Sequence, residues 1–361
     1  MKKKLAYINA DSFIHVDLTI LAGLAKEYDV LWIPVISEDF TDYTDGFLQE
    51  YANNNGITLQ IERLSFRQRS LSNFSFYVRV ARMINRGGYD WVFTAINSPY
   101  WAVISALFLR MPVIQGFHDF QQHSGFNQRT MLQLSAILAS LLHKHFVFYS
   151  QSQLLLFKKK YPGKHVGYVG MVGLDYGISD IRPRPLNEGI RLLFFGRIDF
   201  YKGLDRLISS LEDLSTKDIH PFKLTIRGRG PFWTTCEPLI QHPDLFDVEI
   251  RFIENAEIPD LFCAHHFLVL PYRDTTQSGP MMIALHYGIP VIAPSLPAFL
   301  EHCHPDNAII YNDDDLMGAL SKCFSLSQAE YDAICENWKQ ESECCTSEFI
   351  VRNYISFFNQ I

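Results

Sequence analysis

Cysteine is absent from the first 235 residues of this 361-residue sequence, and the seven cysteines that follow form no CxxC or Cys/His finger pattern. Their odd number and spacing argue against a disulfide framework or a zinc finger, so a reduced setting is expected. Long apolar runs are also lacking, because Pro99–Leu109 and Met131–Leu142 are shorter than the roughly 20 residues that cross a bilayer. Met1 and three lysines lead directly into a short strand, so no signal peptide is expected. These features together predict a cytoplasmic protein.

Charge is distributed unevenly between the two halves of the chain. Residues 1–170 contain 17 Lys and Arg against 12 Asp and Glu, whereas residues 171–361 contain 15 against 27. This asymmetry indicates different binding partners for the two halves. The whole chain carries a formal charge of −7 and shows no nucleic-acid recognition motif, so no nucleic-acid partner is expected.

Length and composition favour two folded domains. Hydrophobic residues make up 48% of the chain and charged residues 20%, which is enough to build large cores. In the first half, short apolar segments alternate with longer amphipathic ones, as in a doubly wound parallel sheet. The expected strands there are Leu5–Ile8, Val30–Val35, Trp91–Thr94, Pro112–Gln115 and Phe146–Tyr149, and the expected helices lie around Val16–Glu27, Phe74–Asn85, Pro99–Leu109, Arg129–His143 and Gln153–Lys159.

A polar stretch rich in Pro and Gly, residues 181–189, interrupts this alternation and is expected to be a linker. A second alternation follows, with expected strands Ile190–Phe195, Lys223–Ile226, Glu249–Ile253, Phe267–Leu270 and Pro290–Ala293, and expected helices Gly203–Leu211 and Pro280–Tyr287. The sequence thus predicts an α/β protein of two Rossmann-like, doubly wound domains that face a central cleft. Residues 1–175 form the first domain, 190–326 the second, and 327–361 a helical segment that returns to the first.

The most informative segment is Leu193–Asp205, in which an apolar strand ends at a glycine and a helix follows. The turn presents Arg197 and Lys202 five residues apart, at the strand end where open α/β sheets bind ligands. An Arg fork and a mobile Lys charge together suit a diphosphate. Two solvated surface cations are the alternative.

Two further loops support a phosphate site. After the strand Phe267–Leu270, Ser278 is the expected N-cap of a helix with Pro280 in its first turn, and such a helix N-terminus attracts phosphate. An ordinary capped βαβ unit is the alternative. The loop at residues 227–231, Arg-Gly-Arg-Gly-Pro, lets backbone approach a ligand closely, although such a short sequence also arises by chance.

Taken in order and spacing, these three segments resemble the retaining GT-B glycosyltransferases of family 4, from Leu193 to Glu301. The resemblance implies that Arg197 and Lys202 hold the diphosphate of a nucleotide-sugar donor and stabilise it as the leaving group. The donor-binding residues expected from it are Gly196, Arg197, Lys202, Arg227, Gly228, Ile253, Glu254, Thr276, Gln277, Ser278, Gly279, Pro280 and Glu301.

The chain departs from the family pattern at one place. Many members carry two glutamates eight positions apart, near the transferred sugar and the ribose, where this sequence has Thr275 and Ile283. The resemblance therefore does not specify the sugar. No DxD or other metal-ligand pattern appears, and the resemblance implies no metal, no cofactor and retention of anomeric configuration by front-face attack.

The first domain contains a candidate acceptor site. His118 and Asp119 follow the strand Pro112–Gln115, where a histidine can donate hydrogen bonds to substrate oxygens, although a structural histidine is the alternative. The resemblance favours a catalytic His118 near the reacting end of the donor, with His123 and Arg129 as further candidates. Asp11, Ser12 and His15 are expected to touch the acceptor or, alternatively, to cap a helix.

Basic and aromatic residues gather between positions 63 and 86, where Arg63, Arg67, Arg69, Arg79, Arg82 and Arg86 accompany Phe66, Phe74, Phe76 and Tyr77. Such a segment can dock on anionic lipid headgroups, which predicts peripheral contact with the inner membrane surface. A solvated helix face is the alternative.

The expected function is transfer of a sugar from a nucleotide-diphosphate donor to a glycan or lipid-linked saccharide, as in the synthesis of bacterial surface polysaccharides. Two other hypotheses remain open: an inactive GT-B-like binding subunit, which the missing glutamates favour, and a GT-B sugar-nucleotide epimerase, for which no acidic catalytic residues are found.

Overall fold

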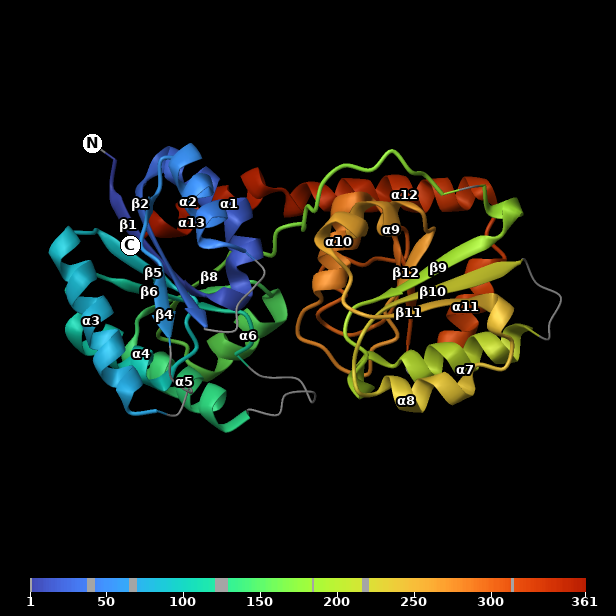
Figure 1. Ribbon diagram of the computed structural model, residues 1–361, viewed down its shortest axis with the longest axis horizontal. Coiled ribbons are helices and arrows are strands. Elements are labelled where there is room, and N and C mark those ends of the chain that lie inside the picture. Colours follow the sequence, from blue (N-terminus) through green and yellow to red (C-terminus); the bar gives the residue numbers. More distant parts are fainter. Residues whose placement is uncertain are drawn as a thin grey trace. The chain divides into compact units, whose positions relative to one another are not determined.

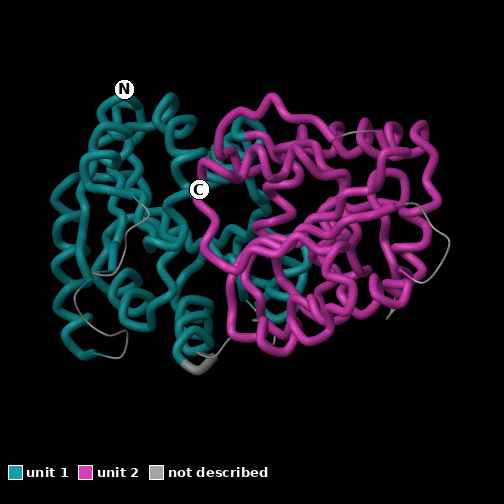
Figure 2. The backbone as a smooth tube through the Cα atoms, turned by 45° about the vertical axis from the view of Figure 1, so that its right-hand side comes forward, with its two compact units in different colours: residues 1–122, 126–172, 347–361 teal, residues 123–125, 173–346 magenta. Residues whose placement is uncertain are grey.

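The computed structural model describes residues 2–37, 43–64, 70–120, 129–183, 185–215, 221–312 and 315–361. These residues form two compact units, which Figure 2 colours separately. Unit 1 contains the described residues up to Val172 together with Ser347–Ile361, and unit 2 contains Gly173–Thr346. Each unit is built on its own parallel sheet, so the predicted pair of Rossmann-like domains is confirmed.

The sheet of unit 1 has eight strands in the order β3-β2-β1-β5-β6-β7-β8, and β4 also pairs with β2. The strands are β1 (Lys4–Ala10), β2 (Asp29–Ser37), β3 (Thr58–Leu59), β4 (Glu62–Leu64), β5 (Trp91–Thr94), β6 (Val113–Phe117), β7 (His145–Phe148) and β8 (His165–Tyr168). The central strands are apolar on both faces, because helices cover both sides of the sheet.

The helices of unit 1 are α1 (Ile14–Glu27), α2 (Asp45–Asn54), α3 (Ser72–Gly87), α4 (Pro99–Phe108), α5 (Arg129–Leu142), α6 (Gln151–Lys160) and α13 (Ser347–Phe358), with the 3-10 helix η1 (Asp11–Phe13). Helices α3, α4 and α5 pack in sequence against one another, and α1 packs against α13 (Figure 1). The last helix of the chain thus belongs to the first unit, whereas α12 (Gln328–Ser342) belongs to the second.

The sheet of unit 2 has six strands in the order β11-β10-β9-β12-β13-β14. They are β9 (Ile190–Phe195), β10 (Phe222–Gly228), β11 (Phe246–Ile250), β12 (Phe267–Val269), β13 (Val291–Pro294) and β14 (Ile309–Tyr311). The helices are α7 (Leu204–Ser215), α8 (Trp233–Cys236), α9 (Ile258–Cys263), α10 (Gly279–Tyr287), α11 (Leu316–Phe324) and α12, with 3-10 helices η2 (Leu186–Glu188), η3 (Phe200–Lys202), η4 (Glu237–Leu239), η5 (Pro243–Leu245), η6 (Asn255–Glu257) and η7 (Glu343–Cys345).

The helices of unit 2 lie in two layers. Helices α7, α8 and α11 form one layer, and α9, α10 and α12 form the other, with the sheet between them (Figure 1). The predicted apolar stripe of α7 is confirmed, because Leu204, Leu207, Ile208 and Leu211 are all fully buried in the core. Burying such a stripe against the sheet holds the start of α7, and with it the loop before α7, in place.

The direction of strand addition reverses once in each sheet. In unit 1 the reversal lies between β1 and β5, and in unit 2 between β9 and β12. Loops that leave the carboxyl ends of two such strands diverge and open a crevice where ligands bind. Ligand sites are therefore expected at the loops after β1 and β5 and at those after β9 and β12.

Most predicted elements are confirmed, but the strand expected at Glu249–Ile253 is shifted. The observed strand is β11, Phe246–Ile250, since the chain turns at Arg251 to enter η6. A capping box between Glu254 and Glu257 begins that turn. Among the described helices, none has both the length and the apolar character that a membrane crossing requires.

Candidate functional site

The loop after β9 carries the predicted phosphate residues and rests on the loop after β10. Gly196 N donates a hydrogen bond to Arg227 O at 3.0 Å, which continues the strand pairing into the loops. Gly228 has a φ of 145°, and a Cβ at this position would lie 1.8 Å from Gly196 O. Only glycine allows this approach, so the glycine of the Arg-Gly-Arg-Gly-Pro loop shapes the phosphate loop.

Lys202 is buried beside two aromatic rings. Its Nζ atom lies 3.7 Å from the centroid of Tyr272 and 5.1 Å from that of Tyr201. Burial lowers the pKa of the Lys202 ammonium to about 7, an effect that Asp199 opposes and Arg197 reinforces. The faces of the two rings replace part of the stabilisation by water that the ammonium loses on burial. A buried amine held in this way gains a full counter-charge when an anion binds.

Arg197 differs from Lys202 because its side chain is 74% exposed. Its Nε atom lies 2.9 Å from Asp199 Oδ2, and this exposed ion pair contributes little stability. The guanidinium is therefore available to exchange one oxyanion partner for another. Its fork geometry fits two phosphate oxygens at once.

The N-terminus of α10 lies next to these two cations. The Ser278 side chain accepts a hydrogen bond from Met281 N at 3.4 Å and donates to the Tyr272 hydroxyl at 3.4 Å. A Cβ built on Gly196 would lie 3.5 Å from Pro280 Cγ, so the loop after β9 borders the first turn of α10. The predicted residues Thr276, Gln277, Ser278, Gly279 and Pro280 form this N-terminus and the loop that leads to it. The dipole of α10 and the Gly279 amide at its start make this N-terminus favourable for an anion.

A pocket of about 600 Å³ opens beside the phosphate loop. It is lined by Phe195, Gly196, Arg197, Gly228, Arg229, Gly230, Arg251, Phe252 and Ile253. Four predicted donor residues, Gly196, Arg197, Gly228 and Ile253, are therefore brought together. Sequence reasoning missed Arg251 and Phe252, although both follow β11 directly and so lie at the same sheet edge. The Arg229 guanidinium lies 5.4 Å from the centroid of Phe252, which places a cation on an aromatic wall.

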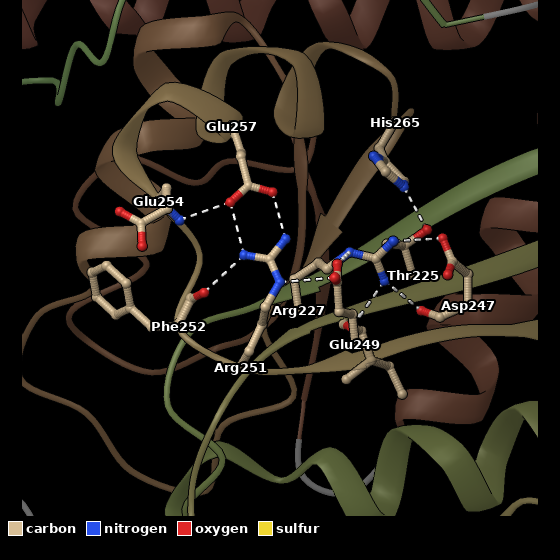
Figure 3. A network of polar contacts seen from close by, with 10 residues as sticks. Thr225, Arg227, Asp247, Glu249, Arg251, Phe252, Glu254, Glu257 and His265 are labelled. Carbon is tan, nitrogen blue, oxygen red and sulfur yellow. Dashed lines mark hydrogen bonds and ion pairs between the residues drawn. The ribbon is translucent and has the colours of Figure 1, made fainter.

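Arg227 is not among the residues that line the pocket. It takes part instead in the ion network that Figure 3 shows. Its guanidinium donates to Asp247 Oδ2 at 2.7 Å and lies 3.3 Å from Glu249 Oε2. Two carboxylates already neutralise this guanidinium, so it adds little attraction for a donor phosphate. The structure therefore assigns Arg227 to holding β10 and β11 together.

Glu254 lies in the same network but does not line the pocket either. Its backbone amide donates to Glu257 Oε1 at 3.0 Å (Figure 3). Its side chain is the other half of the capping box at η6. Arg251 donates to both Glu257 oxygens, at 2.8 and 2.5 Å. The Arg251 guanidinium and the Glu254 amide lower the pKa of Glu257 to about 2. This bidentate pair orients Arg251 at the pocket wall.

The two positions that lack the family glutamates are buried and uncharged in the structure. Thr275 Oγ1 donates to Gln277 O at 2.6 Å and so shapes the loop before α10. Ile283 is 3% exposed and packs in α10. Glu301, also predicted to bind the donor, is not among the residues that line the pocket and lies next to the buried His302.

Unit 1 contains a second pocket, of about 570 Å³, at the carboxyl ends of β1 and β5. It is lined by Ala10, Asp11, Ser12, Phe13, Val35, Ser37, Leu64, Asn73, Tyr77, Ala95, Ile96, Asn97, Ser98, Pro99, His118, Asp119, Met131, Leu132 and Ala136. The predicted residues Asp11, Ser12, His118 and Asp119 therefore share one cavity, whereas His15, in α1, does not line it. Asn97 and Ser98 were missed, although they follow β5 at the reversal of strand order.

His118 is held between two aromatic rings. Its imidazole stacks on Phe13 and on Tyr149, with both centroid distances at 3.9 Å and interplanar angles of 5° and 13°. Its exposed fraction is 7%, so only an edge of the ring reaches the pocket. Stacking fixes the ring plane, and the nitrogens are therefore presented in a defined direction. His123 lies outside the described residues, and only the backbone of Arg129 is described, as the first residue of α5.

The basic segment at 63–86 is partly neutralised. Arg79 makes two hydrogen bonds to the buried Glu62 carboxylate, at 3.1 and 2.6 Å, and Arg63 pairs with Asp45 at 2.6 Å. Phe76 and Tyr77 are buried in the core, whereas Arg82 and Arg86 are exposed on α3. Arg67, Arg69 and Phe66 lie outside the described residues.

One known family model matches part of the second unit. Residues 189–326 match the model of the family described as glycosyl transferases group 1. A GDP-mannose:glycolipid 4-beta-D-mannosyltransferase from Xanthomonas campestris pv. campestris is 28% identical over 132 residues, which cover 34% of this chain and 36% of that relative. The alignment thus spans little more than a third of the length of this relative.

Solved structures resemble almost the entire chain. A sucrose-phosphate synthase from Thermosynechococcus elongatus superposes with a TM-score of 0.72 at 13% identity, covering 99% of both chains. Anabaena Alr3699/HepE, in complex with UDP and glucose, gives 0.70 at 15% identity over 99% of this chain and 100% of that one. At such identities the likeness shows the fold, and the predicted GT-B fold is confirmed.

Proposed function

We propose that this protein is a glycosyltransferase that moves a sugar from a nucleoside-diphosphate donor to a saccharide or lipid-linked acceptor. The observation that supports this most directly is that Tyr272 links the buried Lys202 to the N-cap of α10, whose first turn borders the loop that carries Arg197 into the pocket. The match of residues 189–326 to the group 1 glycosyl transferases supports the same reading independently.

In this proposal the donor diphosphate binds between the loop after β9 and the start of α10. Lys202, Arg197 and the helix amides neutralise the charge that develops when the anomeric carbon–oxygen bond breaks. The acceptor hydroxyl oxygen bonds to the anomeric carbon, and its proton passes to the leaving phosphate oxygen. The products are a glycoside and a nucleoside diphosphate, and no group on the protein need form a covalent intermediate.

The nucleoside is proposed to occupy the pocket beside Phe195 and Ile253, and the acceptor the pocket of unit 1. Asp11, Ser12 and Asp119 offer polar atoms there for sugar hydroxyls, and His118 is proposed to position the reacting groups. A role in bacterial surface polysaccharide or glycolipid synthesis is supported by the Xanthomonas relative, whose name specifies a glycolipid acceptor.

We also propose that the anomeric configuration is retained, because the phosphate-binding segments resemble those of retaining enzymes. The name of the Xanthomonas relative specifies a β-D-mannosyl product, so the configuration needs its own test. Proton NMR of the product formed from a donor of known anomeric configuration distinguishes retention from inversion.

A panel of nucleotide sugars, screened by thermal shift and calorimetry, tests the function. Wild-type protein is expected to bind one nucleoside diphosphate and to release it from the matching sugar donor only when acceptor is present. Arg197→Ala and Lys202→Ala are expected to lose this binding, whereas Lys223→Ala, an exposed lysine elsewhere in unit 2, retains it. Wild-type protein that binds no nucleoside diphosphate would contradict the proposal.

One observation favours a second candidate, a binding subunit without transferase activity. Thr275 and Ile283 offer no carboxylate at the positions where many family members contact the sugar and the ribose. That hypothesis predicts binding of nucleoside diphosphate with no release from any sugar donor in the presence of acceptors.

A further inference from the structure

Four side chains with metal-binding atoms meet in unit 2, and none of them lines the donor pocket. His302 lies in the turn after β13, Glu341 in the last turn of α12, and Cys344 and Cys345 in η7. The ligand atoms of His302, Cys344 and Cys345 all lie within 4.8 Å of one another. The sequence did not reveal this group, because 41 positions separate His302 from Cys344 and no finger spacing is present.

The distances fit the edges of a small tetrahedron. The two sulfurs are 3.7 Å apart, Cys345 Sγ lies 3.8 Å from His302 Nδ1, and Cys344 Sγ lies 3.3 Å from a Glu341 oxygen. Zinc bonds of about 2.3 Å to sulfur and about 2.1 Å to nitrogen or oxygen give tetrahedral edges of roughly 3.8 Å between sulfurs and 3.6 Å from sulfur to nitrogen or oxygen. The remaining measured edge, 2.9 Å from His302 Nδ1 to Glu341 Oε1, is shorter than the roughly 3.4 Å expected and would widen slightly on binding.

The group is held by its surroundings but remains accessible from one side. Asn307 Nδ2 donates to His302 O at 3.0 Å, and Gly173 N donates to Cys345 O at 2.8 Å, so both backbones are fixed. His302 is 6% exposed and Cys345 3%, whereas Cys344 is only partly buried and gives an ion a way in.

We propose that His302, Glu341, Cys344 and Cys345 form a tetrahedral zinc site. Two thiolates, an imidazole and a carboxylate are ligands that zinc accepts together, and the sulfurs disfavour magnesium and calcium. The bound ion would join the turn after β13 to the end of α12. With all four positions filled by protein, the site is structural and separate from the proposed donor site.

Metal content of the reduced, untagged, full-length protein tests the proposal. After treatment with a chelator and addition of zinc, elemental analysis is expected to find one zinc ion per chain that survives gel filtration. Cobalt in place of zinc is expected to give sulfur-to-cobalt charge-transfer bands and the d–d bands of tetrahedral coordination. Both signals should disappear in Cys344→Ser and Cys345→Ser proteins and persist in Cys335→Ser, a partly buried cysteine outside the cluster.

Glu341→Gln provides a second variant that preserves the side-chain volume in case the cysteine variants fold poorly. It is expected to lower zinc affinity at least about tenfold while far-UV circular dichroism stays unchanged. The proposal would be overturned by the absence of stoichiometric zinc in wild-type protein, or by equal zinc binding by wild-type and a folded Cys344→Ser/Cys345→Ser protein. A Cys344–Cys345 disulfide found by peptide mass spectrometry in protein kept reduced with zinc would overturn it as well.

Discussion

The Nζ atom of Lys202 lies 3.7 Å above the ring of Tyr272, and the Tyr272 hydroxyl accepts a hydrogen bond from the N-cap residue of α10. One aromatic side chain thus links the buried cation of the loop after β9 to the helix N-terminus after β12. Both parts of the proposed anion site are therefore joined through Tyr272. The following predictions test this arrangement and the rest of the proposed site.

The Lys202→Met variant distinguishes the contribution of Lys202 to ligand binding from its effect on protein stability. Loss of a charged donor to a phosphate oxygen is expected to weaken nucleoside-diphosphate binding roughly 10- to 100-fold. The free protein is expected to melt at a higher temperature, because Met does not incur the cost of burying an amine. Calorimetry and thermal unfolding measure the two effects. Lys223→Met, at an exposed position of β10, should change neither; a Lys202→Met protein with wild-type affinity would exclude a phosphate contact.

The pH dependence of binding follows from the same lysine. Burial lowers the pKa of Lys202 from 10.5 to about 7, so between those values the folded protein binds fewer protons than the unfolded chain. This group therefore makes the empty protein more stable as pH rises from about 7 to 10.5, whereas diphosphate favours the protonated form. Affinity should fall above pH 7, and binding at pH 8 should take up a proton. Calorimetry in two buffers of different ionisation enthalpy detects the uptake, which should vanish in Lys202→Met.

Gly228→Ala tests the contact between the two glycine loops. The new Cβ would lie 1.8 Å from Gly196 O, at a φ of 145° that side chains rarely adopt. We expect a loss of roughly 2–4 kcal/mol in the free energy of unfolding, together with loss of diphosphate binding. Gly279→Ala is the matched control for stability, since its Cβ would meet no described atom within 4 Å. Chemical denaturation of both variants is the measurement; equal stability would show that the loops are not packed as described.

His118→Phe preserves the stack with Phe13 and Tyr149 but removes both ring nitrogens. If His118 positions the reacting groups, the transfer rate is expected to fall about 100-fold while diphosphate affinity, which depends on unit 2, stays unchanged. His165→Phe is a suitable control, because His165 also stacks on an aromatic ring, Phe357, outside the pocket. A rate equal to wild type in His118→Phe protein would assign the histidine to packing alone.

Arg82 and Arg86, which are exposed on α3, would carry the membrane docking that the sequence predicts for this segment. If α3 meets an anionic surface, reversing both charges to Glu should reduce sedimentation with anionic vesicles by roughly tenfold or more, at about 1 kcal/mol per cation. Arg110→Glu alters an exposed arginine outside the helix and should have little effect. Equal sedimentation of wild type and the double variant would favour the solvated-face alternative.

The repetition of short apolar strands and amphipathic helices made the fold predictable. Trp91–Thr94 and Ile190–Phe195 were predicted at their observed bounds, because each is a short apolar strand delimited by turn residues. The apolar stripe of α7 could also be predicted, because its four apolar residues recur at the spacing of a helix. Short elements such as β3 and β14 escaped prediction, as two or three residues give no measurable period.

The candidate site was predictable only where its residues follow strand ends. Gly196, Arg197 and Gly228 meet in one pocket because parallel strands bring their carboxyl ends to one edge. Arg227 is also at that edge, but its guanidinium turns to Asp247 and Glu249 on the adjacent strand. Which arginine is engaged by a neighbouring carboxylate depends on side-chain contacts across strands, and the local sequence does not contain that information.

Neighbouring residues in the chain were enough to predict the alternation of elements, the glycine turn after β9 and the two cations in that turn. Tertiary structure alone decided that Lys202 is buried against Tyr272, that His118 is stacked between two rings, and that His302 meets Cys344 and Cys345. Charge, pKa and metal-binding geometry depend on neighbours in space, and folding brings those neighbours from distant parts of the chain.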